Sequence, residues 1–593
     1  MKFNPAQEQA VTYNGHCLVL ACPGSGKTAV LRGRAIRKLK MTPKVKGLGV
    51  TFSKEAAKEL ERRVLNDYPE AAGSFTVGTF HSLCKRQLNE AGIEVSLVNE
   101  AQQAAFVKSA WMDIMAGRNL YTLEDVRVYI EAVKSQVDPV LPDPKRDPRV
   151  QVYLRYQEML RQRGLMDFSD MLLNAVKKMD TGEVKPWRVG WILVDEAQDC
   201  DMVQMRWALS HQRRNIELTV VGDDDQSIFS WRSAGGLPLL NAFREQTGAA
   251  LITLNTTYRC PQEVIRPAGR LIALNKDRMS KQLRTENMAR GLVRRVPAKD
   301  LEDEVELLVE AVLESGAPGD WGILARSNSI LTRVEKLVAD RFPITRSSGR
   351  SFWELKYPSI YLAMVRSITR DDLLGVDYAL RMAGVPEQRL AKIHGAFGTR
   401  TRGGLTRYLK DRSPVLPGED TFKAVASQWR MFLAQGKPDT ALKGVEMYLL
   451  GLGERLVDRT PGKSANDMLA TATSHISSSF RIIASMRGSI QQRLRLIDAP
   501  DVDNIDAEGE DEKGEGTGSG PARLMTLHGS KGLEFPNVWM MSCDAGVIPA
   551  RGSLLEEERR LFYVGMTRTK ERLFMSYHSA RPSVFLTECG LLD

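Results

Sequence analysis

The sequence has few cysteines and no long apolar run. Its seven cysteines are scattered and form no Cys-x-x-Cys pair, so neither a zinc site nor an iron–sulfur cluster is predicted. No apolar stretch reaches the roughly 18 residues that cross a bilayer. The start, MKFNPAQEQA, lacks the apolar centre of a secretory signal. These absences exclude a membrane or secreted class and predict a reduced, cytoplasmic protein.

Length and charge narrow the class further. A chain of 593 residues is too long for one hydrophobic core, and about three to five domains are expected. The net charge is +10, but residues 501–515 carry eight acids and one lysine. The rest of the chain is therefore more basic than the total suggests. A basic body favours a polyanionic partner such as nucleic acid.

Short apolar runs recur in two groups, and each run ends in polar or glycine-rich residues. Runs of this length between helical patterns are typical of buried parallel strands. The first group is HCLVLA (16–21), GLGVTF (47–52), WILVDE (191–196), ELTVVGD (217–223) and LITLN (251–255). The second is GILAR (322–326), RLMTL (523–527), NVWMMS (537–542) and ERLFMSY (571–577). Two α/β sheets are therefore predicted.

Two long stretches between these runs have a helical rather than a strand-like pattern. Residues 84–185 and 358–500 are rich in Leu, Arg, Gln, Glu and Ala at helical spacing, which predicts helical insertions into the two sheet domains. Residues 501–521 are acidic and then glycine-rich. Such a composition cannot bury a core, so a disordered linker is expected there.

A phosphate-binding loop is predicted at ACPGSGKT (21–28). It follows an apolar strand and precedes a helical pattern, which is the context that such a loop requires. Backbone N–H groups of the loop and the helix N-terminus would hold the phosphates. Lys27 would reach the β- and γ-phosphates, and Thr28 would bind Mg²⁺.

A pair of acidic residues follows the apolar run WILV and forms a second candidate site. Asp195 closes this strand and is the expected magnesium partner, directly or through water. Glu196 beside it is the expected catalytic base or water-orienting group. Two acids at the end of a strand are common and indicate little by themselves. The predicted phosphate loop is what makes a catalytic role for this pair the favoured interpretation.

With these residues placed, the chain resembles UvrD/Rep-type DNA helicases of superfamily 1A. The resemblance rests on a series of motifs in the family's order, from Asn4 to Leu573. They are NPAQEQAV (4–11), TFSKEAAKEL (51–60), TVGTFHS (76–82), DFSDML (167–172), VGDDDQSIFSWRSA (221–234), LNTTYRCPQEV (254–264), LMTLHGSKGLEFPNVW (524–539) and EEERRLFYVGMTRTKERL (556–573).

The family implies two RecA-like domains of the P-loop NTPase type, each interrupted by a mostly helical insertion, with ATP held between them. The expected pieces are domain 1A at 1–83 and 186–257, insertion 1B at 84–185, domain 2A at 258–357 and 522–593, insertion 2B at 358–500, and the linker at 501–521.

The resemblance also implies the nucleotide contacts. Tyr258 would stack on the adenine, Gln7 would read its edge, and Glu534 would contact the ribose side. Arg259 and Arg568 would reach the γ-phosphate, which suits a planar, permanently charged group. The ATP loop itself would comprise Cys22, Pro23, Gly24, Ser25, Gly26, Lys27 and Thr28.

The stretch VGDDDQSIFSWRS (221–233) combines acids with aromatics. By resemblance, Gln226 senses the γ-phosphate, whereas Phe229 and Trp231 form a platform for DNA bases. Base–aromatic stacking tolerates any sequence, which suits a motor that moves along DNA. Further DNA contacts would come from Phe52, Thr79, His81, Arg232 and His528.

Ala29 departs from the family pattern. An arginine that covers the other face of the adenine is usual there, and Arg32 lies one helical turn further on. This departure leaves the preference for ATP over other nucleotides open. Phe229 stands where the family usually has tyrosine, which keeps the ring.

The predicted function is an ATP- and Mg²⁺-dependent helicase that moves 3′→5′ on single-stranded DNA and acts at single-strand/duplex junctions. Polarity rests on the resemblance alone. We expect a monomer or weak self-association, a nucleoid-associated location, and a place in DNA repair or replication. Two alternatives stay open: a translocase that mainly strips proteins from single strands, and a P-loop ATPase switch without a nucleic-acid track.

Overall fold

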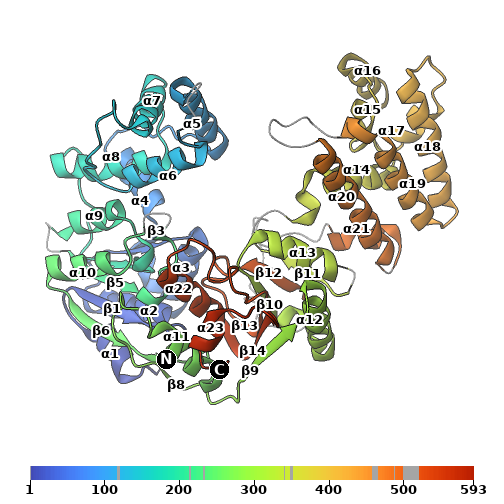
Figure 1. Ribbon diagram of the computed structural model, residues 1–593. Helices are drawn as coiled ribbons and strands as arrows, with labels where there is room; N and C mark the ends of the chain where they lie inside the picture. Colours follow the sequence, from blue (N-terminus) through green and yellow to red (C-terminus); the bar gives the residue numbers. More distant parts are fainter. Residues whose placement is uncertain are drawn as a thin grey trace. The chain divides into compact units, whose positions relative to one another are not determined.

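The computed structural model describes residues 2–115, 120–212, 216–230, 234–339, 341–347, 351–456, 465–486, 488–497 and 520–592. The chain forms two compact units, each with a six-stranded sheet and an inserted group of helices (Figure 1). Unit 1 comprises Met1–Val293, Ile548–Glu571 and Val584–Asp593, and unit 2 comprises Arg294–Val547 and Arg572–Ser583.

The sheet of unit 1 is parallel throughout, in the order β3-β2-β4-β5-β1-β6. The carboxyl ends of all six strands therefore lie along one edge. Five strands coincide with the first group of apolar runs, and β3 is additional. The strands are β1 (Cys17–Ala21), β2 (Gly47–Thr51), β3 (Phe75–Thr79), β4 (Trp191–Val194), β5 (Glu217–Gly222) and β6 (Ala250–Leu254).

Both faces of this sheet are buried, which explains why its central strands are apolar without alternation. In β1, Leu18 and Leu20 face one side, and Cys17, Val19 and Ala21 face the other. The first side is covered by α4 (Phe80–Glu90), α8 (Phe168–Thr181), α9 (Met202–Ser210) and α10 (Gly236–Thr247). The second is covered by α1 (Pro5–Thr12), α2 (Lys27–Met41) and α3 (Lys54–Asp67).

Three further helices and a two-stranded pair complete the sheet part of unit 1. Helix α11 (Gln262–Ile272) packs against α22 (Leu555–Met566) and α23 (Val584–Glu588). A two-stranded pair joins β7 (Thr256–Thr257) to β8 (Arg284–Thr285). Tyr258 and Arg259, which directly follow β7, and Arg568, which follows α22, thus belong to unit 1.

The second sheet belongs mainly to unit 2 and has the order β11-β12-β10-β13-β14-β9. Ile323 pairs in parallel with Leu524 on one side and Trp539 on the other. Helices α12 (Leu301–Ser315) and α13 (Asn328–Val338) cover it. The strands are β9 (Leu292–Ala298), β10 (Trp321–Ala325), β11 (Ile344–Arg346), β12 (Ala522–Thr526), β13 (Phe535–Met540) and β14 (Thr569–His578). The predicted α/β class with two sheets is confirmed.

Two groups of helices are inserted, one in each unit, and each has its own apolar core. The first group contains α5 (Glu100–Met115), α6 (Leu123–Lys134) and α7 (Pro148–Gln162), with α8 beside them. The second contains α14 (Lys356–Arg370), α15 (Val376–Met382), α16 (Glu387–Phe397), α17 (Gly404–Lys410), α18 (Pro417–Ala434), α19 (Pro438–Gly451), α20 (Ala465–Ser485) and α21 (Ile490–Ile497). Residues 501–519 of the predicted linker 501–521 lie outside the described residues.

All seven cysteines are buried free thiols. Among the residues that the structure describes, no helix has both the length and the apolar character needed to cross a bilayer.

A buried ion pair fixes the start of α8 in unit 1. Asp167 is the N-cap of α8 and accepts a hydrogen bond from the Asp170 N–H. Lys134 Nζ lies 2.5 Å from Asp167 and 2.9 Å from Asp170, and the Tyr156 hydroxyl donates to Asp167 at 2.7 Å. Burial alone would raise the pKa of Asp167, but Lys134 outweighs burial and lowers it. The DFSD segment thus ties α6 and α7 to α8.

We expect Lys134→Met to lower the free energy of unfolding by about 3–5 kcal/mol, because it leaves a buried carboxylate without its cation. Urea unfolding followed by circular dichroism measures this. Lys108→Met, at an exposed position of α5, is the matched control, and its effect should stay within about 0.5 kcal/mol. Equal effects of the two variants would contradict the ion pair's structural role.

Candidate nucleotide and DNA site

The predicted phosphate loop joins β1 to α2, and α2 begins at Lys27. Gly26 is the N-cap of α2 with a φ of +80°, and Gly24 has a φ of +69°. Left-handed backbone of this kind favours glycine. Thr28 occupies the second position of α2 and is half-buried. The first N–H groups of α2 have no partner inside the helix, so they are suited to an anion.

The two glycines also allow close packing against neighbouring segments. A Cβ atom at Gly24 would lie 2.5 Å from the Arg259 Cβ, and one at Gly26 would lie 2.9 Å from the Gln7 Nε2. The Tyr258 N–H donates to the Gly24 carbonyl at 2.9 Å. The loop is therefore held between the start of the chain and the segment that carries Tyr258 and Arg259.

Gln7 and Tyr258 are joined through Asn4. Gln7 Nε2 donates to the Ser25 carbonyl at 2.9 Å, and its Oε1 accepts from the Asn4 N–H at 3.0 Å. Asn4 Nδ2 donates to the Tyr258 hydroxyl at 2.9 Å. The Tyr258 side chain is exposed. This arrangement brings together the two residues that were predicted to contact the adenine.

Arg32 makes an ion pair with Asp67 at 3.3 Å. Both residues line a hollow of about 350 Å³, together with Phe3 and Gly33. Arg32 is thus engaged with the last residue of α3.

Lys27 forms a close ion pair with Glu196. Lys27 Nζ lies 2.8 Å from each carboxylate oxygen of Glu196. Burial would lower the pKa of Lys27, but Glu196, Asp195 and Asp223 outweigh burial and raise it. Lys27 is therefore a fully charged ammonium at the mouth of the loop, and it is held by the predicted catalytic carboxylate.

The acidic pair at the end of β4 has an unusual backbone. Glu196 has a φ of +49°, a conformation that costs energy in residues other than glycine and that clusters at functional sites. Burial, with Glu196 as the second cause, raises the pKa of Asp195 to about 7. A divalent cation beside Asp195 would offset both effects, so the carboxylates fit the predicted magnesium site.

Gln198 links this pair to the next strand. Its Nε2 donates to Glu196 at 2.6 Å, and its Oε1 accepts from the Asp223 N–H at 3.0 Å. Our sequence interpretation did not single out Gln198, although it lies two residues after the quoted run WILVDE (191–196). A buried glutamine two residues after the acidic pair was the signal that could have identified it.

Two arginines and Gln226 meet at the other side of the phosphate site. Arg568 Nη2 donates to Gln226 Oε1 at 2.9 Å, and Arg259 Nη1 donates to the Thr567 carbonyl at 3.3 Å. Burial, together with the repulsion of Arg259, lowers the pKa of Arg568 to about 9. Two guanidinium groups that repel each other favour an anion between them. The structure thus brings together three residues that were predicted to serve the γ-phosphate.

The loop after β5 reaches from the phosphate site toward the predicted DNA contacts. Asp224–Gln226 forms one turn of 3₁₀ helix, in which Gln226 is buried. Phe229 follows three residues later and is half-buried. Trp231 and Arg232 lie outside the described residues.

The other predicted DNA residues of unit 1 end the neighbouring strands β2 and β3. Phe52 is exposed and contacts Phe80 edge to face. Thr79 is the N-cap of α4, where it forms a capping box with Ser82. His81 packs edge to face against Phe168, an exposed aromatic that the sequence interpretation did not select. Burial lowers the pKa of His81, which favours the neutral ring.

Along the edge of this sheet, the order of the strands separates the predicted DNA contacts from the predicted nucleotide contacts. Phe52 follows β2 and His81 follows β3, whereas the acids, the predicted γ-phosphate sensor Gln226 and the phosphate loop follow β4, β5 and β1. His528 and Glu534 belong to unit 2, where they precede β13; His528 is half-buried and Glu534 is exposed.

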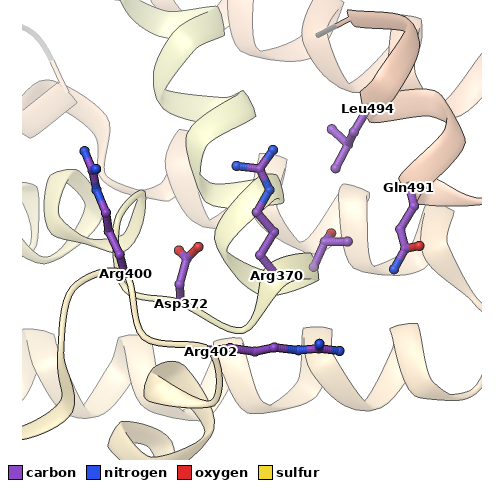
Figure 2. Close-up of a pocket in the computed structure, with 7 residues that line it drawn as sticks. Arg370, Asp372, Arg400, Arg402, Gln491 and Leu494 are labelled. Atoms are coloured by element: carbon purple, nitrogen blue, oxygen red, sulfur yellow. The ribbon is translucent and has the colours of Figure 1, made fainter.

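Unit 2 has a basic hollow of about 430 Å³ in its helical insertion (Figure 2). Arg370 ends α14, while Arg400 and Arg402 lie in the segment before α17. Asp372 lies between Arg370 and Arg400, and α21 contributes Gln491 and Leu494 (Figure 2). Three exposed guanidinium groups around one hollow suit phosphate groups.

The phosphate site of unit 1 offers further groups to a nucleotide. Ser25 Oγ is buried and has no hydrogen-bond partner among the described residues. Together with Lys27, the arginine pair and the acidic pair, it fits a triphosphate with a divalent cation. The fold and this site define a P-loop nucleotide-binding protein with parallel α/β sheets.

Comparisons with known proteins give the family. Residues 3–246 match the UvrD/REP helicase N-terminal domain, and residues 505–580 match the UvrD-like helicase C-terminal domain. The chain is 28% identical over 630 residues to the ATP-dependent DNA helicase PcrA of Bacillus subtilis, covering 97% of this chain and 82% of the relative. It is also 28% identical to the ATP-dependent DNA helicase Rep of Escherichia coli, covering 97% and 90%. The chain belongs to the UvrD/Rep-type helicases of superfamily 1A.

Proposed function

We propose that the protein is an ATP-dependent DNA helicase that moves 3′→5′ along single-stranded DNA and unwinds duplex DNA. The observation that carries this proposal is the loop after β5. It places Gln226 against Arg568 and leads, three residues later, to Phe229. Loss of the γ-phosphate could thus shift Gln226 and, through the residues that follow it, the proposed base-stacking ring of Phe229.

The two ligands would occupy adjacent parts of one sheet edge. ATP would lie at the ends of β1, β4 and β5, with Lys27, Arg259 and Arg568 on its phosphates. Thr28 and Asp195 would hold Mg²⁺, which would neutralise phosphate charge. Single-stranded DNA would follow the ends of β2 and β3, where Phe52 and Phe168 are exposed. The direction of movement is supported by the family resemblance alone.

The basic hollow of unit 2 suits the duplex arm of a junction. Most hydrogen bonds between proteins and DNA go to the sugar–phosphate backbone, and Arg370, Arg400 and Arg402 provide cations without base-reading geometry. A partner of this kind agrees with the basic net charge of +10.

The proposal is tested by ATP hydrolysis with and without single-stranded DNA, followed by strand displacement on duplexes with a 3′ or a 5′ single-stranded tail. We expect DNA to stimulate hydrolysis and the 3′-tailed duplex to be unwound. Stimulation without unwinding would favour a translocase that displaces proteins. A rate that is independent of DNA would contradict a DNA motor and favour an ATPase switch.

We expect Trp231→Ala and Phe229→Ala each to weaken binding of single-stranded DNA by about 1–3 kcal/mol, because each removes a stacking ring. The DNA-free ATPase rate should stay close to that of the wild type, since the phosphate contacts survive. Fluorescence anisotropy with a labelled oligonucleotide measures the affinity. If both rings only pack the protein, affinity, ATPase rate and melting temperature will fall together.

A further inference from the structure

Three consecutive carboxylates at the end of β5 are buried around one lysine. Asp223, Asp224 and Asp225 are almost fully buried, and Lys281 has no exposed side-chain surface. Lys281 Nζ lies 2.6, 2.7 and 2.9 Å from the three carboxylates in that order. Arg278 makes a bidentate pair with Asp225, with both distances at 2.8 Å. The acids therefore face cations of this chain.

The cluster continues into the proposed γ-phosphate site. Asp223 Oδ1 accepts from Lys281, and its Oδ2 accepts from Gln226 Nε2 at 2.5 Å. Because the amide nitrogen of Gln226 is thereby directed at Asp223, its oxygen faces Arg568. The result is a continuous chain of contacts, Lys281–Asp223–Gln226–Arg568, in which each group orients the next.

Residues 275–287, which we call the bridging segment, carry Lys281 and touch the other parts of the site. The Met279 N–H donates to Asp224 at 2.7 Å. Asn287 Nδ2 donates to the Arg259 carbonyl at 2.7 Å, and Asn275 Nδ2 donates to the Glu556 carbonyl in α22 at 2.9 Å. The bridging segment thus contacts the turn Asp224–Gln226, the segment that carries Arg259, and the helix that precedes Arg568.

We propose that Lys281 is a positioning residue for ATP hydrolysis: it fixes Asp223, so that the Gln226 amide presents its oxygen to Arg568. This inference rests on the proposed function. Arg278 neutralises the same cluster through Asp225, whereas Lys281 bonds Asp223, the carboxylate that accepts from the Gln226 amide. Lys281 therefore has a role in orientation that Arg278 does not share.

A buried lysine of this kind also stabilises the fold, so the test separates orientation from stability. The matched pair is Lys281→Met and Arg278→Met, since each removes one cation from the same acids. We expect Lys281→Met to lower the DNA-stimulated kcat by about a hundredfold, the usual scale for a small misplacement at a reacting centre, with little change in KM for ATP. Arg278→Met should lose stability but keep kcat within a few-fold. Lys281→Arg should restore part of the rate.

Equal losses of kcat in Lys281→Met and Arg278→Met, in step with their melting temperatures, would overturn the proposal. Where Lys281→Met does not fold, Asp223→Asn decides, because it keeps the shape of the side chain and leaves Lys281 two carboxylates. A strong loss of kcat with a near-native melting temperature supports the proposal, and a full kcat overturns it. A wild-type enzyme without DNA-stimulated ATPase would instead refute the proposed function.

Discussion

Arg568→Gln is expected to lower ATP turnover by about 10³- to 10⁵-fold, the range for an arginine that stabilises the transferred phosphoryl group. Arg568 is buried beside Arg259, and its pKa is lowered to about 9 by burial and by that neighbour. Such a charge is costly in the nucleotide-free protein and becomes favourable once an anion lies between the two guanidinium groups. The substitution should therefore remove activity while leaving the melting temperature of the free protein unchanged or higher.

The measurement is kcat with saturating single-stranded DNA, together with thermal unfolding. Arg559→Gln is a suitable control, because Arg559 lies on α22 and pairs with Glu588 at 2.8 Å, outside the phosphate site. The control should lose stability rather than activity. Turnover of Arg568→Gln within tenfold of the wild type would contradict the role of Arg568 as a phosphate contact.

The amino-acid sequence predicts the elements of the sheets better than their edges. Nine apolar runs correspond to strands, because strands buried on both faces consist of consecutive apolar residues. The strands that were not predicted are less uniform. β3 has half-buried positions, and β9 carries two consecutive exposed arginines.

The phosphate loop and the acidic pair could be predicted because each is local in sequence. The partners of the three aspartates could not. Nothing near Asp223 indicates that Lys281 neutralises it, since the contact spans 58 residues and depends on how α11 and the bridging segment return to β5. The same holds for Arg259 and Arg568: the motifs identify them, but their common place in unit 1 follows from tertiary packing.

The residues that were predicted to contact DNA differ in what the structure shows of them. Phe52 is exposed at the end of its strand, as a base-stacking residue requires, whereas the hydroxyl of Thr79 is used to cap α4. The first N–H groups of a helix lack partners inside it, so the start of α4 would favour a backbone phosphate. Thr79 would then act through the helix that it starts.

Glu196→Gln is expected to reduce ATP hydrolysis by about 10²- to 10⁴-fold, the usual contribution of a positioned base, while ATP still binds. In this structure Glu196 holds Lys27 through both carboxylate oxygens, so it competes with phosphates for the same ammonium group. A neutral amide of the same shape releases Lys27. Nucleotide affinity should therefore equal or exceed that of the wild type, as measured with a fluorescent ATP analogue.

Lys27→Ala gives the complementary result, because it removes the cation that both partners use. We expect this variant to lose turnover and to bind ATP more weakly, with nucleotide-free DNA affinity retained. The two variants thus share one defect in hydrolysis and differ in the sign of their effect on ATP binding. If Glu196→Gln fails to bind ATP, the roles of Asp195 and Glu196 are exchanged, and Glu196 rather than Asp195 is the group that supports the nucleotide's metal ion.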